Sequence, residues 1–432
     1  MKQKPYYSLI WLAALGSAAL SATTNEPLVK AENSIPLDAL VAEALEKNPE
    51  LRFYEAELQA AKAGRKTAGQ WANPEATGGV GQKRVTAGSL PAEGLAWSVS
   101  VVQPFEWPGR LGLRKAIANR DIELAELGYA RFKVALAARV RTLAYDLFAA
   151  QERAATTGEV AERFKDLREV LVQRDPAGLT PLLETRVIEA TELNAQRKAS
   201  DARLAAQSAL LELNQLRGVA PDRGLIVGQA QLAFRPADER TLLTALARTN
   251  NFELRMREAE LAQQGFRVDL TKNERFPAIA LGPSYSVENA GDRERIVGVA
   301  VSLPLPLWNR NGGNIEAAKA RQQQAEISLN VAERDVQRQV LAAALTYETK
   351  LREMANWRPD SVQHFMEAAE LADRHYRLGA VSISTYVELQ KQYLEAVESL
   401  LDTKREALAA AAQLELLTGL TPSLISSKEE RK

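Results

Sequence analysis

The sequence predicts a mainly helical, internally duplicated chain that also contains a small β portion. Three observations predict this fold class: a residue pattern that recurs 201 to 203 positions later, long segments with heptad spacing of apolar residues, and four short segments in which apolar and small residues alternate. A repeat of this length divides a chain into structurally equivalent units. We therefore expect two similar halves, each with its own helices and strands.

The recurring pattern fixes the boundaries of the two halves. The stretch Asn48-Pro-Glu-Leu-Arg52 returns 203 positions later as Asn251-Phe-Glu-Leu-Arg255, and Trp107 and Gly178 return 201 positions later as Trp308 and Gly379. We assign the first repeat to residues 23–218, a linker to 219–236, the second repeat to 237–420 and a C-terminal tail to 421–432.

Residues 1–22 are predicted to be a secretory signal peptide. Two Lys residues precede an apolar run from Leu9 to Leu20, and small residues follow it. That order is typical of an export signal, and the run is shorter than the roughly 20 apolar residues that a membrane-spanning helix needs. Cleavage after Ala19 or Ala22 is expected, so the mature protein lies outside the cytoplasm.

Each half is predicted to open with one helix, at 36–70 and at 237–273. A much longer helical region follows, over 109–174 and over 312–378, with Pro359 at a local break in the second. A last helix then runs to Arg217 and to Leu417. A helix of roughly 65 residues would be about 100 Å long. Such lengths are typical of coiled coils rather than of compact domains.

The apolar residues of these helices form narrow seams. Leu136, Val140, Leu143 and Leu147 are spaced by four, three and four residues, and Val387, Leu394, Leu401 and Leu408 are spaced by seven. A seam of this spacing packs against another helix in a coiled coil.

Four segments, at about 74–86, 94–104, 277–288 and 294–304, have the alternation and length of tilted outer-membrane strands. The apolar positions expected to face lipid are Trp97, Val99, Val101, Ile279, Leu281, Tyr285, Val297, Val299 and Val301. The chain re-enters helix at two turns, which contain Trp107, Pro108 and Gly109 in the first half and Trp308, Gly312 and Gly313 in the second. A small soluble sheet packed on helices is the alternative to a membrane sheet.

Four strands are too few to close a barrel in a membrane. Single-chain barrels begin at about eight strands, and lipid does not tolerate an open sheet edge because its backbone groups find no partner there. Other copies of the chain must therefore supply the missing strands. Two copies would give a filled barrel and three a barrel with a lumen, which the long helices would continue as a hollow conduit.

Composition excludes several other classes of function. The 432 residues include 55 Lys and Arg, 55 Asp and Glu, two His and no Cys. The balanced charge gives no basic surface for nucleic acid, and the lack of Cys removes disulfides, thiolate ligands and thiol nucleophiles. His364 and His375 lie eleven residues apart, so they cannot chelate one ion within a subunit. We therefore expect no catalytic residue, no metal site and no cofactor.

Several motifs, in the same order in both halves, resemble the TolC-like outer-membrane efflux proteins. They are Asn48-Pro-Glu-Leu-Arg52, Gln103-Pro-Phe-Glu-Trp-Pro-Gly-Arg110 with its echo Pro304-Leu-Pro-Leu-Trp-Asn-Arg310, and Tyr376-Arg-Leu-Gly379. The stretch Pro306-Leu-Trp-Asn-Arg-Asn-Gly-Gly313 is most similar to the heavy-metal, CzcC-type branch of this family. The resemblance covers about residues 36 to 420. It implies a homotrimer in the outer membrane of a Gram-negative bacterium, with a twelve-stranded β-barrel in outer-membrane lipid and a periplasmic α-barrel.

The resemblance also implies partners and a function. The trimer would dock a periplasmic membrane-fusion adaptor and an inner-membrane resistance-nodulation-division (RND) pump, as the exit duct of a tripartite efflux system for heavy-metal cations or other small toxic compounds. Two other functions remain open, namely a periplasmic coiled-coil structural or adaptor protein without a pore, and a TolC-like duct for drugs or type I secretion. Many members of this branch carry a lipidated Cys, which this chain lacks. Anchoring of the protein in the outer membrane would then depend on the trimeric β-barrel alone.

The resemblance places a gate where the long helices turn, near Gly178 and Gly379. Tyr376 matches a tyrosine of the family's gate, and Glu184 and Glu388 match acidic positions that line its constriction. The family's basic residue and first acidic residue in the second copy are replaced here by Val381 and Thr385. The alternative is that Glu184 and Glu388 are ordinary solvated residues of helix surfaces.

Overall fold

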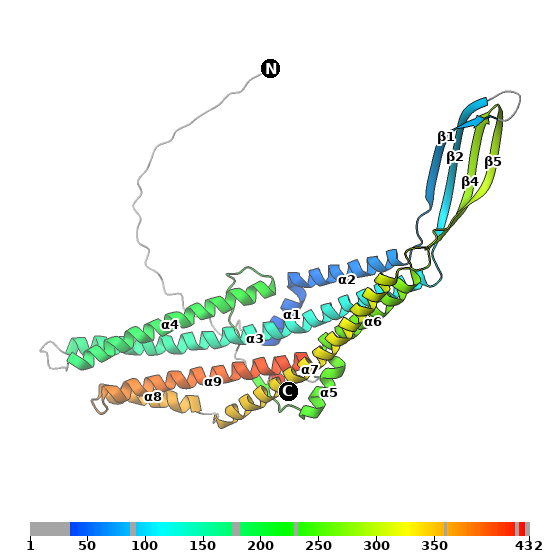
Figure 1. The fold of residues 1–432 in the computed structure, drawn as a ribbon. Helices are drawn as coiled ribbons and strands as arrows, with labels where there is room; N and C mark the ends of the chain where they lie inside the picture. Colours follow the sequence, from blue (N-terminus) through cyan, green and yellow to red (C-terminus); the bar gives the residue numbers. More distant parts are fainter. Residues whose placement is uncertain are drawn as a thin grey trace, which may run out of the picture.

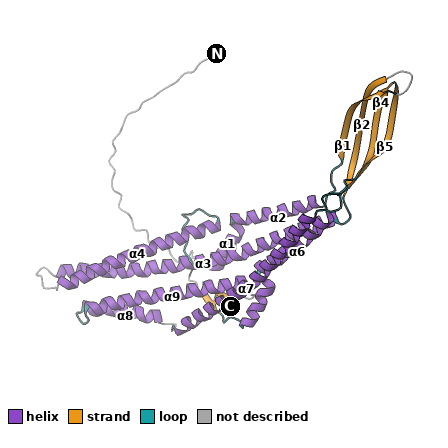
Figure 2. Ribbon diagram, in the orientation of Figure 1, coloured by secondary structure: helices purple, strands orange, loops and turns teal. Residues whose placement is uncertain are grey.

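The protein is an elongated helical bundle with a narrow four-stranded sheet at one end, as the computed structural model shows (Figure 1). The structure describes residues 35–86, 92–174, 182–228, 232–357, 361–419 and 423–427. The expected signal peptide, Gly178 and Pro359 lie outside these ranges. Helices dominate the described part, and the strands are confined to the tip of the molecule and to one short pair beside the bundle (Figure 2).

The two halves repeat the same order of elements. The first contains α1 (Leu37–Lys47), α2 (Pro49–Ala68), β1 (Glu75–Val85), β2 (Ala92–Phe105), α3 (Arg110–Arg174) and α4 (Leu182–Arg217). The second contains β3 (Leu232–Phe234), α5 (Arg240–Asn250), α6 (Phe252–Asn273), β4 (Ile279–Ala290), β5 (Asp292–Ser302), α7 (Gly312–Asn356), α8 (Ser361–Arg377), α9 (Ile383–Thr418) and β6 (Ile425–Ser427). Apart from the short strands β3 and β6, each half is two helices, a hairpin and long returning helices.

The prediction of a single opening helix in each half is wrong, because a buried asparagine interrupts it. Asn48 has an extended backbone, and its side chain accepts a hydrogen bond from the Glu50 N–H (2.8 Å) while donating to the Leu216 carbonyl (2.9 Å). Asn251 accepts from the Glu253 N–H (2.9 Å) and donates to the Leu417 carbonyl (3.0 Å). Each asparagine therefore caps one helix and ties it to the end of another, which helical periodicity alone does not reveal.

Replacing Asn251 by Ala is expected to lower the free energy of unfolding by about 2–3 kcal/mol. The substitution removes a helix cap and leaves a buried carbonyl without its donor. Asn251→Asp is the matched control, since it keeps the capping oxygen and loses only the donor. In thermal unfolding followed by circular dichroism, the midpoint of Asn251→Asp should lie between those of the wild type and of Asn251→Ala. Equal midpoints for all three proteins would contradict this role.

The long helix of the first half forms unbroken as expected, and that of the second half is divided on either side of Pro359, where a break was predicted. α3 runs unbroken for 65 residues from the sheet to the far end of the molecule (Figure 1). Its counterpart consists of α7, which ends at Asn356, and α8, which begins at Ser361. The seam of α3 is buried, since Leu136, Val140 and Leu147 are at most 4% exposed. In the seam of α9, Leu394, Leu401 and Leu408 are buried and Val387 is half-buried.

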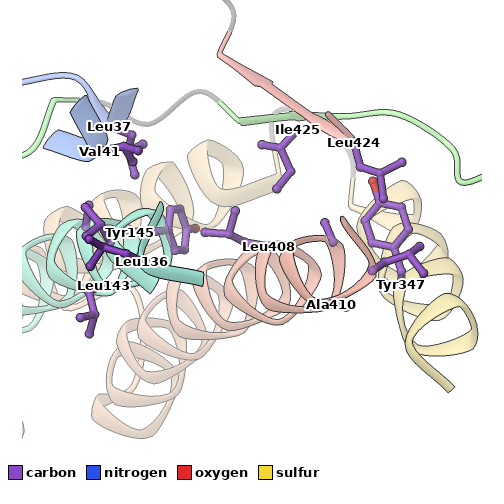
Figure 3. Packing of buried hydrophobic residues seen from close by; sticks show 14 of the residues in the cluster. Leu37, Val41, Leu136, Leu143, Tyr145, Tyr347, Leu408, Ala410, Leu424 and Ile425 are labelled. Carbon is purple, nitrogen blue, oxygen red and sulfur yellow. The ribbon is translucent and has the colours of Figure 1, made fainter. Parts of the chain in front are cut away.

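The main core lies at the middle of the bundle, where α1, α3, α7 and α9 meet (Figure 3). Tyr145 and Tyr347 are fully buried there, and the Tyr347 hydroxyl donates to the carbonyl of Arg235 (2.7 Å). The linker and the tail add the two-stranded sheet β3–β6, which places Leu424 and Ile425 over this core. Three-residue strands are too short for alternation to predict them.

The four-stranded sheet joins the two halves. Its order is β1-β2-β4-β5, with every neighbouring pair antiparallel. The contact between halves is β2–β4, in which Trp97 opposes Val287 and Val99 opposes Tyr285. β1 and β5 are therefore the two edges of the sheet.

Candidate channel wall and periplasmic gate

The strand register places every residue predicted to face lipid on a single face of the sheet. Directly paired residues share a face, so Val99, Tyr285 and Val297 lie together, as do Leu281 and Val301. The remaining members of the set, Trp97, Val101, Ile279 and Val299, fall on this face by the same register. The face is open, with Val297 81% and Val299 68% exposed. Its contact with lipid stays a prediction.

The opposite face of the sheet carries mostly small and polar residues, with Val102 and Ile296 as apolar exceptions. Its central positions are Ser98, Ser100, Gly282, Ser284, Ser286 and Gly298. Side chains of this size leave room inside a barrel and present hydroxyl groups to water. The two faces therefore have the characters expected of an outer wall and a lumen.

Aromatic pairs stand at both ends of the apolar face. Trp97 contacts Tyr285 edge to face at 5.5 Å between ring centroids, near the hairpin turns. At the helical end, Trp71 contacts Phe105 at 6.0 Å. The nine residues from Trp97 to Phe105 span about 26 Å along the strand, which is about 20 Å of height at a tilt of about 40° and most of the roughly 25 Å apolar band of outer-membrane barrels.

Beyond Leu95, toward the hairpin turns, both faces become charged. Arg84 and Glu93 form an ion pair on the apolar side. On the small-residue side, Lys83 Nζ lies 2.8 Å from a carboxylate oxygen of Glu288 and 2.8 Å from one of Glu294. Lys83 reaches these strands across Gly94, where a side chain would collide with the carbonyl of Asn289. These charges mark the water-exposed end of the sheet.

The first strand-to-helix turn is tightly packed. Gly109 has φ +90°, and the Trp107 ring stacks on Phe276 at 4.7 Å. Arg110 donates to Asn273 Oδ1 (3.0 Å), to the Asn273 carbonyl (3.1 Å) and to the Phe276 carbonyl (2.6 Å). Pro108 takes part through its carbonyl, which accepts from the Asn273 side chain (2.9 Å).

The second turn is built differently from its expected form. Its left-handed residue is Asn311 (φ +62°), while Gly312 and Gly313 are the first two residues of α7. Asn311 can adopt this conformation because its side chain accepts a local hydrogen bond from the Asn314 side chain (2.6 Å), and it also donates to the Thr271 carbonyl on α6 (2.9 Å). Trp308 is 93% exposed, in contrast to Trp107.

At the opposite end of the molecule, Gly379 ends α8 with φ +75°. Its N–H donates to the Tyr376 carbonyl (2.9 Å), and the Ala380 N–H donates to the His375 carbonyl (2.8 Å). This is a Schellman motif, which requires a left-handed residue after the helix. Ser382 then caps α9 by accepting from the Thr385 N–H (3.3 Å). The turn therefore reverses the chain within five residues.

The structure brings two of the three expected gate residues together. Burial, and secondly the nearby charge of Glu184 on α4, raise the pKa of Tyr376 on α8. Glu388 on α9 is exposed and accepts a hydrogen bond from the Gln392 side chain (3.0 Å). Glu184 is therefore near enough to Tyr376 to act on it electrostatically, whereas Glu388 faces solvent in the single chain.

Sequence reasoning missed the residue that holds Tyr376. The Tyr376 ring stacks on Tyr386 at 5.4 Å, and Tyr386 is fully buried with its edge toward Phe164 at 5.4 Å. Burial and the charge of Asp373 raise the pKa of Tyr386 well above its ordinary value. A signal for it existed, because Tyr386 and Tyr393 are spaced by seven residues on the seam of α9.

Within the described residues, no three His, Asp or Glu side chains are grouped so that they could hold a metal ion. His364 and His375 are both exposed on α8. In the same part of the chain, no helix combines the length and the apolar character needed to cross a membrane.

A sheet with one apolar and one small polar face, attached to a bundle of very long helices, defines a subunit of a TolC-like outer-membrane channel. The chain belongs to the outer membrane efflux protein family, whose model matches residues 40–219 and 243–420. It is therefore an efflux protein of the outer membrane, and its helical part extends into the periplasm.

Individual relatives agree with this assignment. The chain is 26% identical over 352 residues to the nickel-cobalt-cadmium resistance protein NccC of Alcaligenes xylosoxydans xylosoxydans, covering 76% of this chain and 75% of NccC. It is 27% identical to the cobalt-zinc-cadmium resistance protein CzcC of Cupriavidus metallidurans, covering 50% of this chain and 51% of CzcC. The crystal structure of the CmeC outer membrane channel of Campylobacter jejuni shares the fold, with a TM-score of 0.72, 15% identity and coverage of 96% and 94%.

Proposed function

We propose that three copies of this chain form the exit duct of a tripartite efflux system that removes heavy-metal cations from the cell. The observation that carries the proposal is the four-stranded sheet, whose edges β1 and β5 have no partner strand among the described residues. Each edge has unpaired backbone groups, which lipid does not tolerate. Joining β5 of one copy to β1 of the next closes a barrel of twelve strands.

The helices support the same mode of closure. Near the sheet, contacts run in the order α2–α3–α6–α7, and toward the far end in the order α4–α3–α9–α8. The first or last helix in each of these two rows carries exposed apolar residues. Leu193 and Leu204 on α4 and Ile327 and Val331 on α7 are examples. These two edges differ, so their contact is head to tail and repeats into a ring.

The metal substrate is supported by the relatives, whose names record resistance to nickel, cobalt, zinc and cadmium. A duct that conducts passively needs no chelating residues, and selectivity would then belong to an RND pump in the inner membrane. A periplasmic membrane-fusion adaptor would connect the pump to the α8–α9 end of the duct.

The proposal predicts that deleting the gene for this chain lowers tolerance to nickel, cobalt, zinc or cadmium, and that plasmid-borne wild type restores it. Metal content of the cells should rise in the deletion strain. Outer-membrane fractions should contain heat-modifiable trimers. If the deletion strain kept its metal tolerance and became less tolerant to drugs, the substrate would be a drug rather than a metal cation. A monomer free in the periplasm would instead support a spacer without a pore.

A further inference from the structure

The duplicated chain contains the same strand-to-helix junction twice, but among the described residues only the Trp and Arg of the first junction contact a partner. Trp107 and Arg110 follow β2, whose neighbour β4 belongs to the same chain. Trp308 and Arg310 follow β5, which is an edge of the sheet. The first junction can therefore serve as a template for what the second one contacts.

In the first junction, the residues that follow β2 bind the end of α6, the helix that precedes the neighbouring strand β4. Trp107 stacks on Phe276, which lies between α6 and β4, at 4.7 Å. Arg110 donates to Asn273 Oδ1 and to the carbonyls of Asn273 and Phe276, at 2.6 to 3.1 Å. Carbonyls at the C-terminal end of a helix carry partial negative charge, and the guanidinium fork can bind several of them at once.

In the second junction, the same residue types have no partner. Trp308 is 93% exposed and Arg310 is exposed, and Arg310 makes no hydrogen bond or ion pair within the described residues. The position equivalent to α6 and Phe276 would be occupied by the segment that precedes β1 of another chain. That segment is the end of α2 followed by Trp71.

The end of α2 has the features that the template requires. Trp71 is 62% exposed, although its edge contacts Phe105 of the same chain at 6.0 Å. α2 ends at Ala68, with Gly69 as its C-cap, just as α6 ends at Asn273 shortly before Phe276. An aromatic ring and helix-terminal carbonyls thus lie beside the free edge β1. The carbonyls of Gln70 and Ala72 already accept from Arg114 (3.2 Å) and Gln103 (2.8 Å), whereas the carbonyl of Gly69 accepts no hydrogen bond from the described residues.

We infer that Trp308 and Arg310 of one copy clamp the end of α2 in the next copy, with Trp308 against Trp71 and Arg310 on the carbonyls that follow α2. The inference rests on the proposed trimer and specifies how its barrel is joined to its helices. Three such inter-subunit clamps would alternate around the ring with the three internal clamps of Trp107 and Arg110.

A lipid surface is the competing partner for Trp308. Leu303, Leu305 and Leu307 are also exposed and continue the apolar positions of β5 toward the helices. The template favours protein over lipid, because Trp107 stands at the equivalent level of the sheet and yet stacks on Phe276. Arg310 also matches Arg110, whose hydrogen bonds go to the Asn273 side chain and to the carbonyls of Asn273 and Phe276 at the end of α6.

The absence of Cys makes the clamp directly testable by cross-linking. The variant with Trp71→Cys and Trp308→Cys is compared with a control in which Trp107→Cys and Phe276→Cys replace the internal pair. Membranes are treated with bifunctional thiol reagents of increasing length, and the shortest one that joins the control pair within a chain calibrates the reach. With that reagent, the first variant should give covalent dimers and trimers, and each single-cysteine variant should give monomers.

Native trimers that yield no covalent species with the calibrated reagent would overturn the clamp while leaving the exit duct intact. Absence of trimers in wild-type outer membranes would instead remove the duct itself. A second readout uses Trp308→Ala, which should lower the temperature at which trimers dissociate in detergent, whereas Trp308→Phe should largely retain it. Trp308 fluorescence tests lipid as the alternative contact, in a variant with Phe at the other Trp positions. Strong quenching by phospholipids with brominated acyl chains would show that Trp308 contacts lipid and would contradict the clamp.

Discussion

Replacing Val299 by Arg is expected to block stable insertion of the barrel. Val299 is 68% exposed at the middle of the apolar face, between the aromatic pairs at its two ends. An arginine near the bilayer midplane of an outer-membrane barrel costs about 2–4 kcal/mol. The proposed trimer would incur this cost three times. The measurement is the fraction of protein recovered as heat-modifiable trimer from outer membranes, and Val301→Arg should behave in the same way.

The matched control is Ser302→Arg, because Ser302 is adjacent to Val301 and lies on the small-residue face. A charge on the lumen side stays hydrated, so trimer recovery should remain close to wild type. A reversed pattern, with Ser302→Arg defective and Val299→Arg tolerated, would mean that the sheet faces lipid with its other side. The four-stranded topology itself would survive that result.

The fold was largely predictable because its determinants are long and periodic. Heptad spacing extends over dozens of residues in α3 and α9, and alternation extends over about ten residues in each strand, so chance matches are rare. The duplication then confirmed each element a second time within one sequence. The single-helix prediction failed at Asn48 and Asn251 because one capping side chain breaks a helix without changing the surrounding periodicity.

The site was less predictable because its contacts join segments far apart in the sequence. The charge of Glu184 on α4 acts on Tyr376 on α8, and Tyr386 is buried against Phe164 of α3. Neither contact has a local pattern. The second turn also departs from its motif, since Asn311 rather than a glycine takes the left-handed conformation. The glycines and the tryptophan of the motif predicted where the chain turns, but they did not predict which residue adopts the left-handed backbone conformation.

The largest functional effect is expected at the periplasmic end, where Tyr376→Ala combined with Glu388→Ala should raise single-channel conductance in planar bilayers. We propose that the stack of Tyr376 on Tyr386 holds α8 against α9 in the closed state and that exposed Glu388 adds charge to the constriction. An aromatic pair contributes about 0.5–1.5 kcal/mol, so its loss should favour the open state by about two- to tenfold per subunit. Tyr376→Phe is the matched control, since it keeps the ring and should remain closed.

Replacing Glu184 by Gln tests the charge of the same constriction. Three-fold symmetry would repeat each carboxylate into a ring, which attracts cations and repels anions. The substitution keeps the size of the side chain and removes three charges, so the reversal potential in a salt gradient should shift toward that of a nonselective pore. Glu189→Gln, one to two turns further along α4 and ion-paired with Arg186, should leave selectivity unchanged. Wild-type ion preference in Glu184→Gln, together with wild-type conductance in the Tyr376 and Glu388 double variant, would place the gate elsewhere in the duct.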